Sequence, residues 1–207
     1  MYKNRMNRQT PALLCISNRK LFQGDRDEYL TRLAQIDGLG IPVVLREKDL
    51  PEDEYIDLAR EVISRCKNAI LHTYISAAAS LGYRKIHLTM DLLRNSDISG
   101  FELVGASAHT VEDAVEAERL GASYITLSHI FETDCKKGVP PKGLSLITDA
   151  RKKVNIPIYA LGGINAENCD SVVLAGASGA ALMSEFMRGE NVPEWILKRR
   201  ARRLLWE

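Results

Sequence analysis

The sequence predicts an α/β protein folded as a (β/α)₈ TIM barrel in a single domain. Short apolar segments rich in β-branched residues alternate with amphipathic helical segments, and the alternation repeats eight times over the 207 residues. Strands that alternate with helices favour a parallel sheet, and eight such units are typical of a closed barrel. An open doubly wound sheet is the alternative, but no GxGxxG motif follows the first strand segment.

The strand segments are short, apolar and evenly spread along the chain. No linker, internal repeat or low-complexity segment divides them. We therefore expect one domain over residues 1–207, with 1–10 as an N-terminal extension and 192–207 as a closing helix. The expected strands are 12–16, 42–45, 69–72, 85–88, 102–106, 124–127, 157–160 and 179–182.

Helical spacing of apolar residues marks the segments between the strands. In 25–37 the apolar residues recur at the spacing of one helix face. Pro51 is expected in the first turn of the next helix, where its missing N–H costs nothing. Thr110 and Asp113 resemble a capping box, and Asn165 is expected to cap the helix that ends near residue 176. The other helical segments are 75–81, 144–154 and 192–206, and 91–99 is the weakest part of the pattern.

Composition and charge argue against several classes of partner. The hydrophobic share is 45% and the charged share 27%, both ordinary for a globular protein. The formal net charge is +1, so no global field attracts nucleic acid or an anionic membrane, and we expect neither as a partner. The basic residues of 198–203 are expected to close the last helix, with a polyanion-binding patch as the alternative.

Targeting and redox features favour a cytoplasmic protein. Residues 1–10 are polar and basic with no apolar core behind them, which predicts no signal peptide. No stretch approaches the roughly 20 apolar residues of a membrane span. The four cysteines form no CxxC pair and resemble reduced thiols. A homo-oligomer is left open, because the apolar residues of 195–206 either close the barrel or meet a second subunit.

Polar residues just past strand ends form the candidate site, since the active site of such a barrel lies at the carboxyl ends of its strands. The run 128–138 crowds ionisable side chains and hydroxyls behind one strand. Its His129 is the candidate for proton transfer near neutral pH, and a structural histidine is the alternative. Thr133 and Lys136 of the same run are expected substrate contacts.

Two other strand ends carry a predicted phosphate site. Gly162 and Gly163 follow the seventh strand segment, and Met183 and Ser184 follow the eighth. Loops after these strands often bind phosphate in barrels. Glycines let the backbone come close to an anion, and N–H groups can point at it. A structural tight turn is the alternative use of paired glycines.

The second and fifth strand ends add further candidates. Arg46 and Lys48 suit an anionic or carboxylated ligand. Ser107 and His109 would face the same mouth, and His109 is a second candidate for chemistry. His87 lies within a strand and is expected to be a satisfied core or interface residue. No His, Cys and Asp cluster has zinc-ligand spacing.

These segments resemble the thiamine phosphate synthase/TenI superfamily of small TIM barrels. The resemblance runs from about residue 12 to residue 187. It rests on VLREKDL at 44–50, GASAH at 105–109, the run 128–138, ALGGI at 160–164 and ASGAALMS at 177–184. It implies a small-molecule thiazole phosphate as ligand.

Within the superfamily, the sequence is most similar to the TenI thiazole tautomerases. Thiamine phosphate synthases carry Asn-Asp after the third strand and a second magnesium carboxylate after the fourth. Here the matching positions are His72, Thr73 and Asp91. A single carboxylate would hold a magnesium diphosphate poorly, so neither a metal nor another cofactor is expected. The HxFETDxKKG form of 129–138 is similar to that of the tautomerases.

The resemblance implies an isomerase of thiamine biosynthesis, in which His129 moves a proton to aromatise a carboxylated thiazole phosphate. Two alternatives stay open. One is a thiamine phosphate synthase that joins a pyrimidine diphosphate to a thiazole phosphate, and the other is a non-catalytic regulator that binds thiazole or thiamine phosphates. Glu185 departs from the family pattern, and its charge beside the phosphate loop is acceptable only if the side chain points away.

Overall fold

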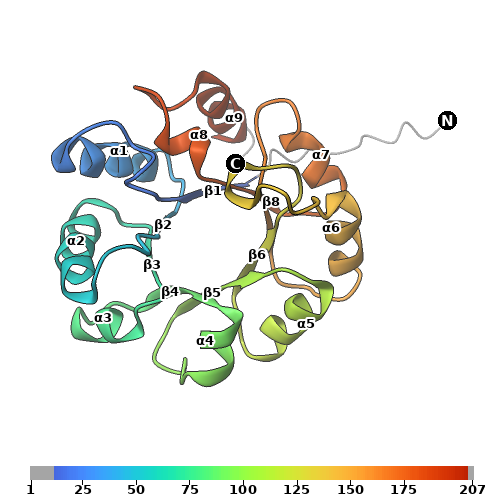
Figure 1. The fold of residues 1–207 in the computed structure, drawn as a ribbon, viewed down its shortest axis with the longest axis horizontal. Helices are drawn as coiled ribbons and strands as arrows, with labels where there is room; N and C mark the ends of the chain where they lie inside the picture. The colour runs from blue at the N-terminus through green and yellow to red at the C-terminus, as the bar shows by residue number, and fades with distance from the viewer. Residues whose placement is uncertain (1–11, 205–207) are drawn as a thin grey trace.

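Eight parallel strands form a closed barrel in chain order (Figure 1). The structure is a computed structural model that describes residues 12–204, apart from the side chains of 135 and 200–204. The barrel closes where Ala12 pairs with Gly179. The predicted (β/α)₈ barrel is confirmed. The strands are β1 Ala12–Ile16, β2 Val43–Leu45, β3 Ala69–His72, β4 Lys85–Thr89, β5 Leu103–Ala108, β6 Tyr124–Ser128, β7 Ile158–Leu161 and β8 Gly179–Leu182.

The helices surround the strands as an outer ring (Figure 1). A short α4 occupies the stretch whose pattern was weakest, and a 3₁₀ turn, η1 (Asp134–Lys136), lies between β6 and α6. The α-helices are α1 Arg26–Gly38, α2 Glu52–Arg65, α3 Ile75–Ser80, α4 Met90–Asn95, α5 Val111–Arg119, α6 Gly143–Arg151, α7 Cys169–Leu174, α8 Ser184–Met187 and α9 Glu194–Leu204.

Two helix caps differ from those expected. Thr110 accepts a hydrogen bond from the Asp113 N–H at 3.0 Å, but the Asp113 carboxylate accepts from the His109 N–H instead of completing a capping box. The prediction that Asn165 caps a helix is wrong. Asn165 Oδ1 accepts from the N–H of Asn168 in a preceding turn, and Asn168 is the residue before α7. An Asx-type turn uses the same side-chain oxygen as a cap, so the sequence signal is the same.

Apolar side chains fill the barrel on both sides of the sheet. Most of the core lies between the strands and the helices. A smaller cluster fills the lumen and consists of Leu14, Ile16, Val44, Ile70, Tyr124 and Ala181. Gly105 makes room in this lumen, because a Cβ at that position would overlap the rings of Tyr124 and His87. The barrel is therefore packed inside, and its carboxyl-end mouth is left for a site.

The C-terminal segment packs against the barrel as far as it is described. Trp195 is half-buried and Ile196 is fully buried, so these two apolar residues of α9 serve to close the barrel. The first ten residues and 205–207, where the rest of the expected helix falls, lie outside the described residues.

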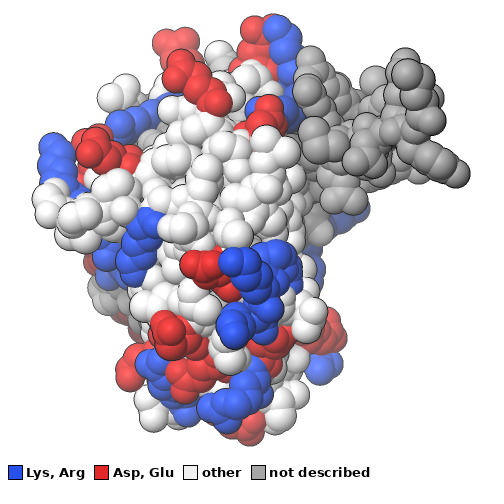
Figure 2. Space-filling view, turned by 90° about the vertical axis from the view of Figure 1, so that its right-hand side faces the viewer, with Lys and Arg blue, Asp and Glu red and all other residues white. Residues whose placement is uncertain are grey.

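The surface carries charges of both signs. On the face in Figure 2, basic and acidic side chains are intermixed around a broad uncharged area. None of the helices within 12–204 is both long and apolar enough to span a membrane.

Candidate active site

One cavity of about 1620 Å³ opens at the carboxyl ends of the strands. It is larger than the range of about 300–1,000 Å³ usual for a small-molecule site. All the site residues predicted from the sequence line it, although they come from five different strand ends. They are Arg46, Lys48, Ser107, His109, His129, Thr133, Lys136, Gly162, Gly163, Met183 and Ser184.

His129 is placed at the cavity rim by the end of β6. It is 5% exposed, and its Nε2 lies 3.2 Å from the carbonyl oxygen of Val139. A carbonyl can only accept, so Nε2 is the donor in this contact, and in the neutral imidazole Nδ1 carries the lone pair. The backbone is fixed as well, because the Lys142 N–H donates to the His129 carbonyl at 3.0 Å. The ring is therefore buried and held in one orientation.

The paired glycines are required by the packing of β7 against the segment after β6. Gly162 has φ +102°, and a Cβ there would lie 2.6 Å from the Cβ of His129. Gly163 has φ +65°, and a Cβ there would overlap the carbonyl oxygen of Glu132. The Phe131 N–H also donates to the Gly162 carbonyl at 3.0 Å. The structural use of these glycines is thus to hold the His129 segment close, and phosphate contact stays a prediction.

The end of β8 brings Ser184 and a further cation to the mouth. Glu185 accepts a hydrogen bond from Trp195 Nε1 of α9 at 2.9 Å, but it also lines the cavity beside Ser184. Arg188 lines the cavity, and its Nη2 lies 3.8 Å from Asp134 Oδ2 of the β6 loop. Sequence reasoning missed Arg188, because it lies one residue beyond a four-residue helix and not at a strand end.

Three cations gather on the cavity wall between β2 and η1. Burial lowers the pKa of Lys48, and the nearby charges of Arg46 and Lys136 lower it further. All three side chains line the same cavity, although Lys136 is about ninety residues away in sequence. Like charges held together at a cavity wall are the chemistry of an anion site.

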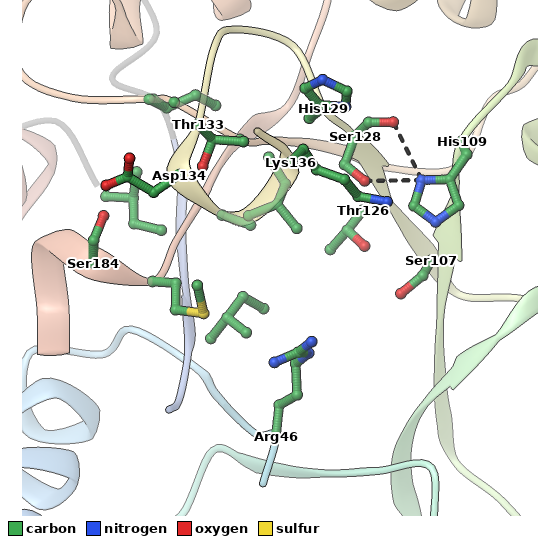
Figure 3. A pocket seen from close by; sticks show the side chains of 18 of the residues that line it. Arg46, Ser107, His109, Thr126, Ser128, His129, Thr133, Asp134, Lys136 and Ser184 are labelled. Carbon is green, nitrogen blue, oxygen red and sulfur yellow. Dashed lines mark hydrogen bonds between the residues drawn. The ribbon is translucent and has the colours of Figure 1, made fainter. Parts of the chain in front are cut away.

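His109 faces the cavity from the end of β5. Its Nδ1 lies 3.0 Å from Ser128 Oγ and 3.3 Å from the Ser128 carbonyl (Figure 3). The other ring nitrogen points toward the side where Ser107 lies. Ser128 directly precedes His129, so the same short segment places both rim histidines.

Two more histidines lie deeper, on the cavity floor. The rings of His72 and His87 stack with centroids 5.6 Å apart. His87 contacts the Tyr124 hydroxyl at 3.0 Å through Nδ1 and Ser107 Oγ at 2.9 Å through Nε2. It is a satisfied core residue, as expected. Burial, followed by the charge of Arg46, lowers the pKa of His87 to about 3. Burial and the neighbouring His87 hold the pKa of His72 well below its ordinary value.

Comparison with known proteins identifies the family. The model for thiamine monophosphate synthase, TMP-TENI, matches residues 13–186. The putative thiamine-phosphate synthase 2 of Aquifex aeolicus (strain VF5) is 35% identical over 187 residues, which cover 86% of this chain and 99% of that protein. Thiamine-phosphate synthase 2 of Streptococcus pneumoniae (strain ATCC BAA-255 / R6) is 30% identical over 196 residues, or 90% and 92% of the two chains.

This chain belongs to the thiamine monophosphate synthase family. A solved structure of thiamine phosphate pyrophosphorylase from Pyrococcus furiosus has the same fold, with a TM-score of 0.77 at 24% identity over 95% of this chain and 98% of that one. The names of these relatives agree with the synthase alternative better than with the tautomerase that the sequence first suggested. The chain is thus an enzyme of the thiamine phosphate synthase family, which acts on small molecules.

The magnesium site expected of a synthase in this family fits the residues present poorly. Mg²⁺ prefers carboxylate and other oxygen ligands. At the ends of β3 and β4 the chain offers a neutral buried His72, the hydroxyl of Thr73, which is bonded to His72 Nδ1 at 2.5 Å, and the carboxylate of Asp91. Within the described part of the chain, no three His, Cys, Asp or Glu side chains come together as metal ligands.

Proposed function

We propose that this family member is a thiazole tautomerase of thiamine biosynthesis. It would convert a carboxylated thiazole phosphate with an exocyclic double bond into its aromatic tautomer. The observation that carries the proposal is His129, a buried histidine at the cavity whose Nε2 is held by the Val139 carbonyl at 3.2 Å. The donor set at the ends of β3 and β4 supports it, because a buried imidazole, a hydroxyl and one carboxylate suit a metal-bound diphosphate poorly.

The proposed chemistry moves one proton. Because Nε2–H is committed to Val139, Nδ1 of His129 is the atom that would accept the proton from the ring carbon. The same nitrogen would return a proton to the exocyclic carbon, and the ring electrons shift to complete the aromatic system. Protons and electrons balance without an oxidant or a reductant. A positioned acid–base group contributes about 10²–10⁴-fold to such a step.

Substrate orientation would come from the two ends of the cavity. In this proposal the phosphate lies against Gly162, Gly163, Met183 and Ser184, and the carboxylate lies against Arg46, Lys48 and Lys136. These groups line the same cavity as His129, so anions held at both ends would fix the ring between them. Ser107, His109 and Thr133 would contact the ring or its substituents.

The deciding experiment measures thiazole aromatisation by ultraviolet absorbance, in EDTA, for wild type and His129→Gln. The proposal expects clear acceleration by wild type and a loss of about 10²-fold in the variant. Circular dichroism and thermal melting verify that both proteins are folded. Wild type that does not accelerate the conversion would refute the tautomerase, whatever the variant does.

The second candidate is the synthase, which is favoured by the names of the relatives. It predicts that wild type joins the pyrimidine diphosphate to the thiazole phosphate when Mg²⁺ is added, and that Asp91→Asn abolishes this coupling. The cation group of Arg46, Lys48 and Lys136 would then contact the diphosphate. Coupling without aromatisation would establish this candidate, and tight ligand binding with neither reaction would establish the regulator.

A further inference from the structure

A buried carboxylate lies directly behind the cations of the cavity wall. Glu47 stands between Arg46 and Lys48 in sequence, yet it is 2% exposed and does not line the cavity. Its neighbours Arg46 and Lys48 both line the cavity. The segment turns just after Glu47, because the Leu50 N–H donates to the Glu47 carbonyl at 3.3 Å.

Three donors from two other elements hold this carboxylate. Ser17 Oγ donates to Glu47 Oε1 at 2.5 Å, and the buried Tyr29 hydroxyl of α1 donates to the same oxygen at 2.6 Å. The Arg19 N–H donates to the other oxygen, Oε2, at 2.9 Å. A carboxylate is an acceptor only, so each of these contacts is made in its preferred sense.

The network extends to the backbone of the cation segment itself. Ser17 Oγ accepts the Arg46 N–H at 2.9 Å while its own hydrogen goes to Glu47. The Ser17 N–H donates to the Val44 carbonyl, also at 2.9 Å. Two residues after Glu47, Asp49 pairs with Arg19 and Lys20. Hydrogen bonds and ion pairs therefore join the loop after β1 to the loop after β2 around Glu47.

We propose that Glu47 is a positioning residue, which with Ser17 and Tyr29 aims Arg46 and Lys48 into the cavity as an anion-binding pair. The inference rests on the proposed anion-binding role of those two cations. It holds for either candidate reaction, because both have an anionic substrate. Glu47 and Tyr29 touch no ligand in this arrangement, and they act by fixing where the charges lie.

The test measures the dissociation constant of inorganic pyrophosphate by titration calorimetry, at a temperature where every variant is folded. Arg46→Gln and Lys48→Gln report on the anion site itself. Glu47→Gln and Tyr29→Phe report on positioning. Tyr83→Phe is the matched control, since it removes a hydroxyl that donates at 2.6 Å to the Ala69 carbonyl at the opposite end of the barrel.

The proposal expects Glu47→Gln to weaken pyrophosphate binding about tenfold and Tyr29→Phe to weaken it about threefold, since small misplacements of binding groups are costly. Tyr83→Phe should bind as wild type. Affinity per folded molecule is not changed by a loss of stability alone, so a merely structural Glu47 would leave it intact. Should Glu47→Gln fail to fold, Tyr29→Phe still decides the question.

Two sets of binding results would overturn the proposal, one by removing the anion site and the other by removing the role of Glu47. If Arg46→Gln and Lys48→Gln bind pyrophosphate as wild type does, or if wild type does not bind it, the anion site is absent. If those variants lose affinity while Glu47→Gln and Tyr29→Phe do not, the anion site stands and positioning by Glu47 is wrong.

Discussion

The four histidines of the chain form two pairs with opposite surroundings. His72 and His87 lie within strands, face each other in the lumen and have lowered pKa values because they are buried. His109 and His129 each lie one residue past a strand, and each has one ring nitrogen held by the protein. A single residue step beyond a strand end thus separates the two histidines of the lumen from the two at the rim, to which the proposed function assigns contact with the substrate.

The two histidines at the cavity rim, His109 and His129, form the rim pair. The largest expected effect comes from a substitution that displaces His129 of this pair. In Gly162→Ala the new methyl group would collide with His129, and the residue would be held at φ +102°. We expect turnover to fall by about 10²-fold through misplacement of the ring, while the interior pair is untouched.

Steady-state kinetics of Gly162→Ala check this expectation, and Gly176→Ala is the control. Gly176 has φ +108°, but it lies before β8, away from the mouth, and its Cβ would meet the flexible side chain of Arg151. The two variants share the backbone strain. Equal loss of turnover in both would show that strain alone, and not the position of His129, is responsible.

A smaller effect is expected within the rim pair itself. His109→Gln keeps a polar group beside Ser128, and if His109 only contacts substrate the loss of kcat/KM should be about tenfold, less than for His129→Gln. The kinetics of both single variants and the double variant measure this. A His109→Gln loss that equals the His129→Gln loss would assign the chemistry to both histidines.

The smallest effect concerns stability and the interior pair. Because the folded-state pKa of His87 is about 3, below the ordinary 6.5, the unfolded chain binds more protons between these pH values. Stability is therefore retained above about pH 6.5 and falls as the pH drops toward 3. Urea unfolding of wild type and His87→Gln from about pH 7 to about pH 4 should give a flatter profile for the variant. Parallel profiles would contradict the role of His87.

Sequence patterns predicted the strands and the residues at their ends well, because both depend on local periodicity. The limits of β1, β3 and β8 agree with the segments expected at 12–16, 69–72 and 179–182. The candidate residues were expected to meet at one mouth because the carboxyl ends of all strands lie at the same end of a barrel. The weak segment after β4 is a single short helix, whose six residues give too little periodicity to be recognised.

Contacts that depend on sheet register could not be predicted in this way. Ser128 reaches His109 because β5 and β6 pair Ala108 with Leu127, which sets the next residues side by side. The burial of Glu47 could not be predicted either, because its partners Ser17 and Tyr29 come from other elements. Register and long-range hydrogen bonding leave no local signature in one chain.

The filled lumen limits the path by which substrate enters and product leaves. With Tyr124 and its apolar neighbours blocking the barrel below the cavity, molecules can enter and leave only through the mouth. A product must therefore depart by the path that the next substrate takes. Accumulated product is expected to compete with substrate for free enzyme, and to slow the enzyme whenever the following reaction is slower than its own.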